Sequence, residues 1–87
     1  MHKVYVLENK EDKSWYIGQT DDLERRIKQH NGGYGARTTG MNGRESWRLI
    51  YVEAYINKSD ALGREKFLKG GSGRIYLKKQ LKHYLGI

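Results

Sequence analysis

The sequence predicts one small domain that contains both strands and helices, in the broad α/β class and more specifically of the α+β type. Three short runs rich in β-branched and aromatic residues are separated by polar turns, and three further segments carry helix caps or an apolar stripe. A chain of 87 residues has room for a single thin core, because a domain of this size buries only about 60% of its unfolded surface. We therefore expect one domain over residues 1–87.

The first two runs predict a hairpin. The run Lys3 to Glu8 is apolar on both faces, which is typical of a covered central strand, and Tyr5 points to the face opposite its two neighbouring valines. The polar segment Asn9 to Ser14 fits a hairpin loop, and Trp15 to Gly18 returns as the second strand. Antiparallel pairing of these runs would place Tyr5 and Tyr16 near each other on one face.

A helix with a marked start follows the hairpin. Asp21 and Glu24 have the spacing of a capping box, and the helix is expected from about Asp22 to Asn31. One stripe follows the i, i+3, i+4, i+7 spacing: Leu23, Arg26, Ile27 and His30. An arginine on an inward stripe is costly unless it meets an anion or hydrogen-bond partners. This pattern distinguishes Arg26 from Arg25, which points elsewhere.

The centre of the chain combines a long loop with the third strand. Asn31 to Ser46 is rich in glycine and has no apolar period, and Arg37 and Arg44 make it a candidate loop for phosphate contact. Trp47 to Tyr55 is the longest β-type run and predicts the third strand.

The remainder predicts two more helices. Ser59 or Asp60 is expected to cap the first of them, which runs to about Lys69 and stops at Gly70-Gly71. One stripe of it contains Ala61, Leu62, Glu65 and Leu68. Glu65 therefore interrupts an apolar face, as Arg26 does on the earlier helix.

Ser72 is the expected cap of the last helix. Its inward side chains are expected to be Leu77, Leu81, Tyr84 and Leu85. Its basic side chains point mostly outward: Arg74, Lys78, Lys79, Lys82 and His83.

Composition favours a polyanionic partner. Seventeen lysines and arginines face ten acidic residues, which gives a net charge of +7, and cations that neutralise phosphates release condensed counterions. A basic surface that serves only solubility is the alternative, and an acidic membrane surface fits less well because no long helix pairs a basic with a broad apolar face. There is no cysteine, the three histidines are dispersed, and polar residues follow Met1 directly. We expect a soluble cytoplasmic protein.

The unusual side chains suit phosphodiester hydrolysis, which needs a deprotonated water and neutralisation of charge on the phosphoryl oxygens. Glu65 suits Mg²⁺, which often takes one or two carboxylates plus substrate phosphate, and Arg26 suits bidentate phosphate binding. Tyr5 and Tyr16 are candidates to position the attacking water or take its proton, with His30 as a further acceptor or phosphate ligand.

Each residue also has a structural interpretation. The tyrosines fit as ordinary strand aromatics, Arg26 as one half of an ion pair, for instance with Glu65, and His30 as a surface or hydrogen-bonded histidine. Glu65 itself fits a helix position whose carboxylate reaches water.

The two tyrosine-bearing runs resemble the motifs that name the GIY-YIG endonucleases. Val4-Tyr5-Val6 stands for GIY and Tyr16-Ile17-Gly18 for YIG. The resemblance covers most of the chain and is strongest to the short stand-alone branch related to the nuclease module of bacterial excision-repair proteins. It implies a small three-stranded antiparallel sheet flanked by about three helices, and DNA cleavage that depends on Mg²⁺ or Mn²⁺.

The resemblance also implies roles for residues. The arginine eight positions after the YIG glycine is Arg26, the histidine-type position twelve after it is His30, and the metal-binding glutamate matches Glu65. The catalytic set is then Tyr5, Tyr16, Arg26, His30 and Glu65. The expected nucleic-acid contacts are Gly18, Arg37, Arg44, Arg74, Lys78 and Lys79. The sequence departs from some members at Gln19, where those carry a lysine.

The leading hypothesis is a metal-dependent endonuclease that cuts DNA in a structure-selective or partner-directed way, in a context such as DNA repair. A catalytically inactive DNA-binding module on the same fold is the alternative, and an interaction domain with incidental charge is a third.

Overall fold

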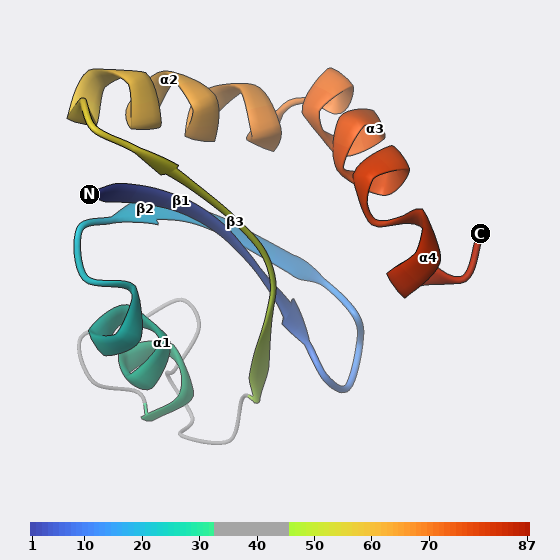
Figure 1. Cartoon of the computed structure of the whole chain (residues 1–87). Coiled ribbons are helices and arrows are strands. Elements are labelled where there is room, and N and C mark those ends of the chain that lie inside the picture. The colour runs from blue at the N-terminus through green and yellow to red at the C-terminus, as the bar shows by residue number, and fades with distance from the viewer. Residues whose placement is uncertain (33–45) are drawn as a thin grey trace.

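A computed structural model describes residues 1–32 and 46–87 of the chain. Along the chain the elements are β1 (His2–Asn9), β2 (Trp15–Thr20), α1 (Leu23–Gly32), β3 (Trp47–Tyr55), α2 (Lys58–Lys69), α3 (Gly71–Gln80) and α4 (Lys82–Leu85) (Figure 1). The strands form one antiparallel sheet in the order β2-β1-β3. The predicted α+β fold with a three-stranded antiparallel sheet is confirmed. The last predicted helix is divided at Leu81, so the described residues contain four helices.

β1 is the central strand, as its apolar alternation predicted. It pairs along its length with β2 on one side and β3 on the other, and Tyr5 lies opposite Gly18 of β2. The register against β3 shifts between Val6 and Leu7. A strand with neighbours on both edges and helices over both faces exposes almost nothing, and Val4 to Leu7 are all buried.

The alternating side chains of β1 divide the core into two clusters, one on each face of the sheet. One face is covered by α2 and α3, and its buried members are Val4, Val6, Ile17, Ala61, Leu68 and Leu77. The other face carries Tyr5, Leu7 and Trp47, which pack with Tyr16 and with Leu23 and Ile27 of α1. Figure 1 shows α1 and α2 on opposite sides of the sheet. Each fully buried Val or Leu contributes roughly 1.5–3 kcal/mol, so both layers matter in so small a core.

The helix caps differ from those predicted. Asp22, not Asp21, caps α1, because its Oδ1 accepts a hydrogen bond from the Arg25 backbone N–H at 3.1 Å. In the turn before the helix, the Thr20 hydroxyl accepts a hydrogen bond from the Asp22 backbone N–H at 3.1 Å and donates one to the Asp22 carbonyl oxygen at 3.3 Å. Asn57 caps α2 in place of Ser59 or Asp60, since its Oδ1 accepts from the Ser59 N–H at 2.8 Å.

The prediction that Ser72 caps the last helix is also wrong. α3 begins directly after Gly70 and has no side-chain cap. The predicted stop at Gly70-Gly71 is confirmed, because α2 ends at Lys69. Tight packing at the α2–α3 junction depends on Gly73, whose added Cβ would lie 2.2 Å from the Phe67 carbonyl oxygen.

One ion pair fixes the rotation of α2 against the sheet. Arg64 donates from Nε to Glu53 Oε1 at 2.8 Å and from Nη2 to Oε2 at 3.0 Å, a bidentate arrangement between α2 and β3. The Arg64 guanidinium also lies 4.5 Å from the ring centre of Tyr76 on α3. This anchoring turns Leu62 outward, where it is 45% exposed, so its predicted inward position is wrong. The same rotation sets the direction of Glu65, which follows Arg64 in the sequence.

α4 returns the chain toward the end of the hairpin. Tyr84, predicted to point inward, is instead 44% exposed, and its hydroxyl donates a hydrogen bond to the buried carboxylate of Glu8. Leu81 and Leu85 are half-buried as expected. In the parts of the chain that the structure describes, no helix has the length and apolar character needed to span a bilayer.

Candidate functional site

A buried hydrogen bond joins the first strand to the first helix at the centre of the site. The Tyr5 hydroxyl lies 3.1 Å from His30 Nε2, and both side chains are 1% exposed. The Tyr16 ring packs beside them, with its centroid 4.6 Å from that of His30 and 6.3 Å from that of Tyr5. The structure thus brings together the two tyrosines and the histidine that the sequence selected separately.

Gly18 leaves the space in which Tyr5 lies. A Cβ added at Gly18 would be 2.6 Å from the Tyr5 hydroxyl oxygen and 3.1 Å from the Tyr16 ring. Any side chain here would have to displace a phenol, because carbon atoms do not approach oxygen that closely. This close approach accounts for the glycine at the end of the YIG-like run.

The charges of Arg26 and Glu65 both act on Tyr5. Burial raises the pKa of Tyr5 well above its ordinary value of 10, the neighbouring Tyr16 and Glu65 raise it further, and Arg26 lowers it. Burial, together with the positive charge of Arg26, lowers the pKa of His30 below its ordinary 6.5. His30 is therefore neutral at pH 7, which leaves one ring nitrogen able to accept a hydrogen bond.

Arg26 and Glu65 are not paired with each other. Glu65 Oε2 lies 2.8 Å from Lys69 Nζ one turn along α2, and the Glu65 side chain is 18% exposed. Among the described residues no ion pair joins Arg26 to Glu65. The structural alternative in which these two charges neutralise each other does not hold.

The residues suit a divalent cation that arrives with its substrate. In the described residues no group of three or more His, Cys, Asp or Glu side chains is arranged to hold a metal ion. Glu65 supplies one carboxylate, and Mg²⁺ or Mn²⁺ commonly combines so few protein ligands with waters and phosphate oxygens. The donor set therefore fits a cation whose coordination is completed by phosphate.

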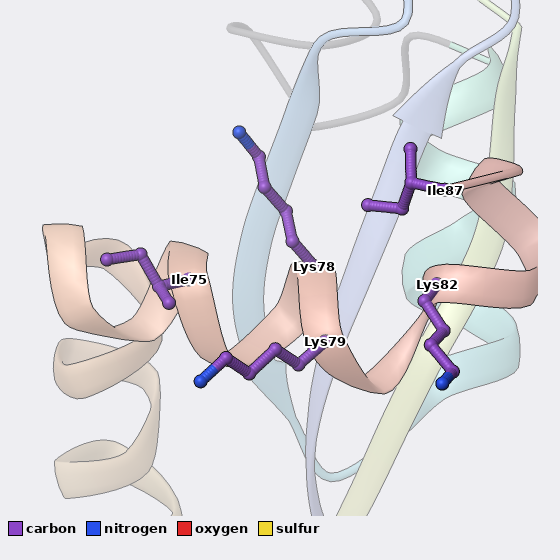
Figure 2. Close-up of a pocket in the computed structure, with 5 residues that line it drawn as sticks. All are labelled: Ile75, Lys78, Lys79, Lys82 and Ile87. Carbon is purple, nitrogen blue, oxygen red and sulfur yellow. The ribbon is translucent and has the colours of Figure 1, made fainter.

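The predicted contacts on the last helix lie away from these groups. Arg74, Lys78 and Lys79 are exposed on α3, which covers the sheet face opposite to Tyr5 and His30. Figure 2 shows Lys78 and Lys79 beside a hollow of about 590 Å³, which is completed by Ile75, Lys82 and Ile87. Their ammonium groups spread in different directions and do not converge on one point. Arg37 and Arg44 lie outside the described residues.

A second hollow adjoins Arg26 and was not foreseen from the sequence. It has a volume of about 190 Å³ and is lined by polar residues: His2, Gln19, Thr20, Asp21, Arg26 and Lys58. His2, Gln19 and Lys58 come from three different elements. One local signal was available, because Lys58 places a positive charge in the first turn of a helix, where it is unfavourable.

The buried histidine predicts a specific dependence of stability on pH. Because folding lowers the pKa of His30, the unfolded chain binds the proton more tightly, and stability falls as pH drops below about 6.5. A scan of the free energy of unfolding between about pH 7 and pH 5 should show this slope, at most about 1.4 kcal/mol per pH unit. His30→Gln should flatten it, and an unchanged slope in that variant would contradict the assignment.

Comparison with known proteins agrees with the fold. Residues 1–81 match the family model described as the GIY-YIG catalytic domain. The chain is 46% identical over 69 residues to the UPF0213 protein CPE1444 of Clostridium perfringens, covering 79% of this chain and 71% of that protein. It is 45% identical over 73 residues to the UPF0213 protein BH0048 of Halalkalibacterium halodurans, covering 84% and 74%.

A solved structure supports the same relationship. The solution NMR structure of the UPF0213 protein BH0048 from Bacillus halodurans superimposes with a TM-score of 0.55 at 40% sequence identity. The match covers 91% of this chain and 83% of that one. The arrangement of sheet and helices is thus shared with a small protein of similar length.

Proposed function

The chain belongs to the GIY-YIG family, and from this premise we propose that it is a metal-dependent endonuclease that hydrolyses phosphodiester bonds in DNA. The observation that carries the proposal is the buried Tyr5–His30 hydrogen bond, on which the opposite charges of Arg26 and Glu65 both act. A structural core has no need of a tyrosine, a neutral histidine and two opposite charges that are not paired with each other in one place, because each carries a desolvation cost.

Tyr5 and His30 act as a proton relay. The raised pKa of Tyr5 means that it rests as a neutral phenol and not as a tyrosinate base. Its hydroxyl takes a proton from the attacking water while passing its own to His30 Nε2, 3.1 Å away. His30 can receive it because its neutral imidazole has a nitrogen lone pair, although burial and Arg26 make it a weaker base than an ordinary histidine. Tyr16, the more accessible of the two tyrosines, orients the water.

Arg26 binds the phosphoryl oxygens. Its guanidinium stays charged and matches two oxygens at once, so it stabilises the negative charge that grows on them during attack. α1 presents it one turn before His30, so the charge stabiliser and the proton acceptor are held by one rigid element.

Glu65 is the residue that would hold the cation. When bound, Mg²⁺ or Mn²⁺ supplies Lewis-acid stabilisation of phosphate oxygens and of the leaving group. The Arg64–Glu53 pair fixes α2 and thereby the direction of Glu65. Lys69 competes for the same carboxylate at 2.8 Å, which keeps affinity for the cation low until phosphate is present.

We also propose how the protein recognises its DNA substrate. Among the described residues, α1, α2 and α3 each contribute apolar side chains to the core on one face of the sheet, and none of the three projects from the domain as a separate base-reading helix. Recognition then depends on DNA structure or on a partner, and not on base sequence.

Supercoiled plasmid tests the activity. Purified protein with Mg²⁺ should convert it to nicked and linear forms, and chelator should stop the reaction. Glu65→Gln removes the charge that holds the cation but preserves side-chain shape, and it should abolish metal-dependent cleavage. Glu24→Gln on the exposed face of α1 is the matched control and should cleave normally. Binding without cleavage in the unaltered protein would favour the inactive DNA-binding module, and equal cleavage by Glu65→Gln would indicate contamination.

A further inference from the structure

The polar hollow beside Arg26 lies where four elements meet. Its lining comes from the start of β1, the end of β2 with the following turn, α1 and the first residue of α2. In Figure 1 these segments converge at one end of the sheet, next to the chain's N-terminus. The lining contains two permanent cations, Arg26 and Lys58, against one carboxylate, Asp21. It is therefore a small, polar, net-positive recess that opens directly from the proposed phosphate-binding arginine.

Lys58 has no evident role in the fold. It is exposed in the first turn of α2, where the positive end of the helix dipole disfavours a cation. None of the ion pairs among the described residues involves it. A charge placed against the local electrostatic preference is better explained by an anion that binds beside it.

The other lining residues make the recess suitable for phosphate. The Gln19 side chain is held near His2, with Nε2 to Nδ1 at 3.5 Å. The Thr20 hydroxyl is engaged with the Asp22 backbone, so that wall is rigid. An oxyanion in the recess would meet a guanidinium, an ammonium group and an amide N–H. The lining residues are all polar, so the recess offers little apolar surface on which a sugar or base could pack in place of the phosphate.

We propose that this recess binds the phosphate next to the scissile one on the same DNA strand, with Lys58 as its principal cation. Arg26 lines the recess and is also the residue proposed to bind the scissile phosphate. One DNA strand could therefore run from the Tyr5–His30 pair to Lys58, with Arg26 between its two adjacent phosphates. The role of Lys58 is to position the strand, and it takes no part in bond breaking. The inference rests on the proposed function for the identity of the strand.

Salt-dependent DNA binding tests this without requiring cleavage. Affinity for a short DNA duplex is measured in chelator over a series of salt concentrations, for the unaltered protein and for Lys58→Gln. Loss of one phosphate contact should reduce the slope of log affinity against log salt by about 0.9 and weaken binding on the order of fivefold near physiological salt. Amide NMR signals of Gln19 and Thr20 should shift with DNA in the unaltered protein and less in Lys58→Gln.

Lys66→Gln is the matched control, because Lys66 is an exposed lysine on the same helix. It should leave the slope unchanged. Lys58→Gln removes an unfavourable charge from the helix start, so it should not destabilise the fold, and a urea titration checks this. Equal losses in both variants, or shifts confined to α3, would overturn the inference. Failure of plasmid cleavage with normal Lys58-dependent binding would instead refute the nuclease and leave the phosphate site standing.

Discussion

Replacement of Arg26 by lysine is expected to slow DNA cleavage by about 10²–10³-fold, comparable to the loss of one oxyanion-stabilising donor. A lysine keeps the positive charge but offers a single ammonium group, so it cannot bind two phosphoryl oxygens in a planar, bidentate way. If the charge of Arg26 is needed chiefly when negative charge develops, the rate constant should fall much more than the affinity. Single-turnover cleavage with Mg²⁺ and DNA binding in chelator separate the two quantities.

Arg25 provides the control for this substitution. It is the adjacent residue, it is exposed where Arg26 is half-buried, and the α1 cap uses only its backbone N–H. Arg25→Lys should therefore cleave at nearly the normal rate. Equal losses in the two variants would mean that general basicity, and not the inward position of Arg26, drives the reaction. A loss in Arg26→Lys that is explained wholly by weaker binding would also contradict its role in the transition state.

The sequence predicted those features that depend on local periodicity. Alternation along β1 separated Tyr5 from its neighbouring valines, and the structure places them in different core clusters. The spacing on α1 selected Arg26 and His30 for the inward stripe, and both are at least half-buried. The periods of two residues in a strand and 3.6 residues in a helix follow from backbone geometry, so they do not depend on contacts with distant parts of the chain.

The sequence could not predict what depends on contacts between distant elements. The outward position of Leu62 follows from the Glu53–Arg64 pair between β3 and α2, which no local pattern reveals. From the sequence, the Glu65 carboxylate could pair with Arg26 or face solvent. In the structure it pairs with Lys69. The caps lie one to three residues from their predicted positions, because Asp22 accepts from the Arg25 N–H and Asn57 from the Ser59 N–H, and composition alone does not decide which of several neighbouring Asp, Asn or Ser side chains does so.

Replacement of Gly18 by alanine is the second change with a large expected effect. A Cβ at this position would lie 2.6 Å from the Tyr5 hydroxyl and 2.8 Å from the ring carbon that bears it. Overpacking of this kind costs about 1–3 kcal/mol of folding stability, although alanine is otherwise favoured over glycine in a strand. A shift of the hydroxyl by about 1 Å from His30 can also cost on the order of 100-fold in cleavage rate. Gly63→Ala is the control, because nothing lies within 4 Å of its Cβ and helix formation should improve.

A double-mutant cycle identifies the clash as the cause. Tyr5→Phe removes the hydroxyl oxygen that the new methyl group would strike, so Gly18→Ala should destabilise the Tyr5→Phe protein less than it destabilises the unaltered one. We expect a coupling free energy of about 0.5–3 kcal/mol from urea unfolding of the four proteins. Cleavage should not recover in the double variant, because the proposed relay to His30 has lost its hydroxyl. Additive free energies of unfolding would show that Gly18 is needed for some reason other than the space it gives Tyr5. Recovery of cleavage without the hydroxyl would remove Tyr5 from the proton path.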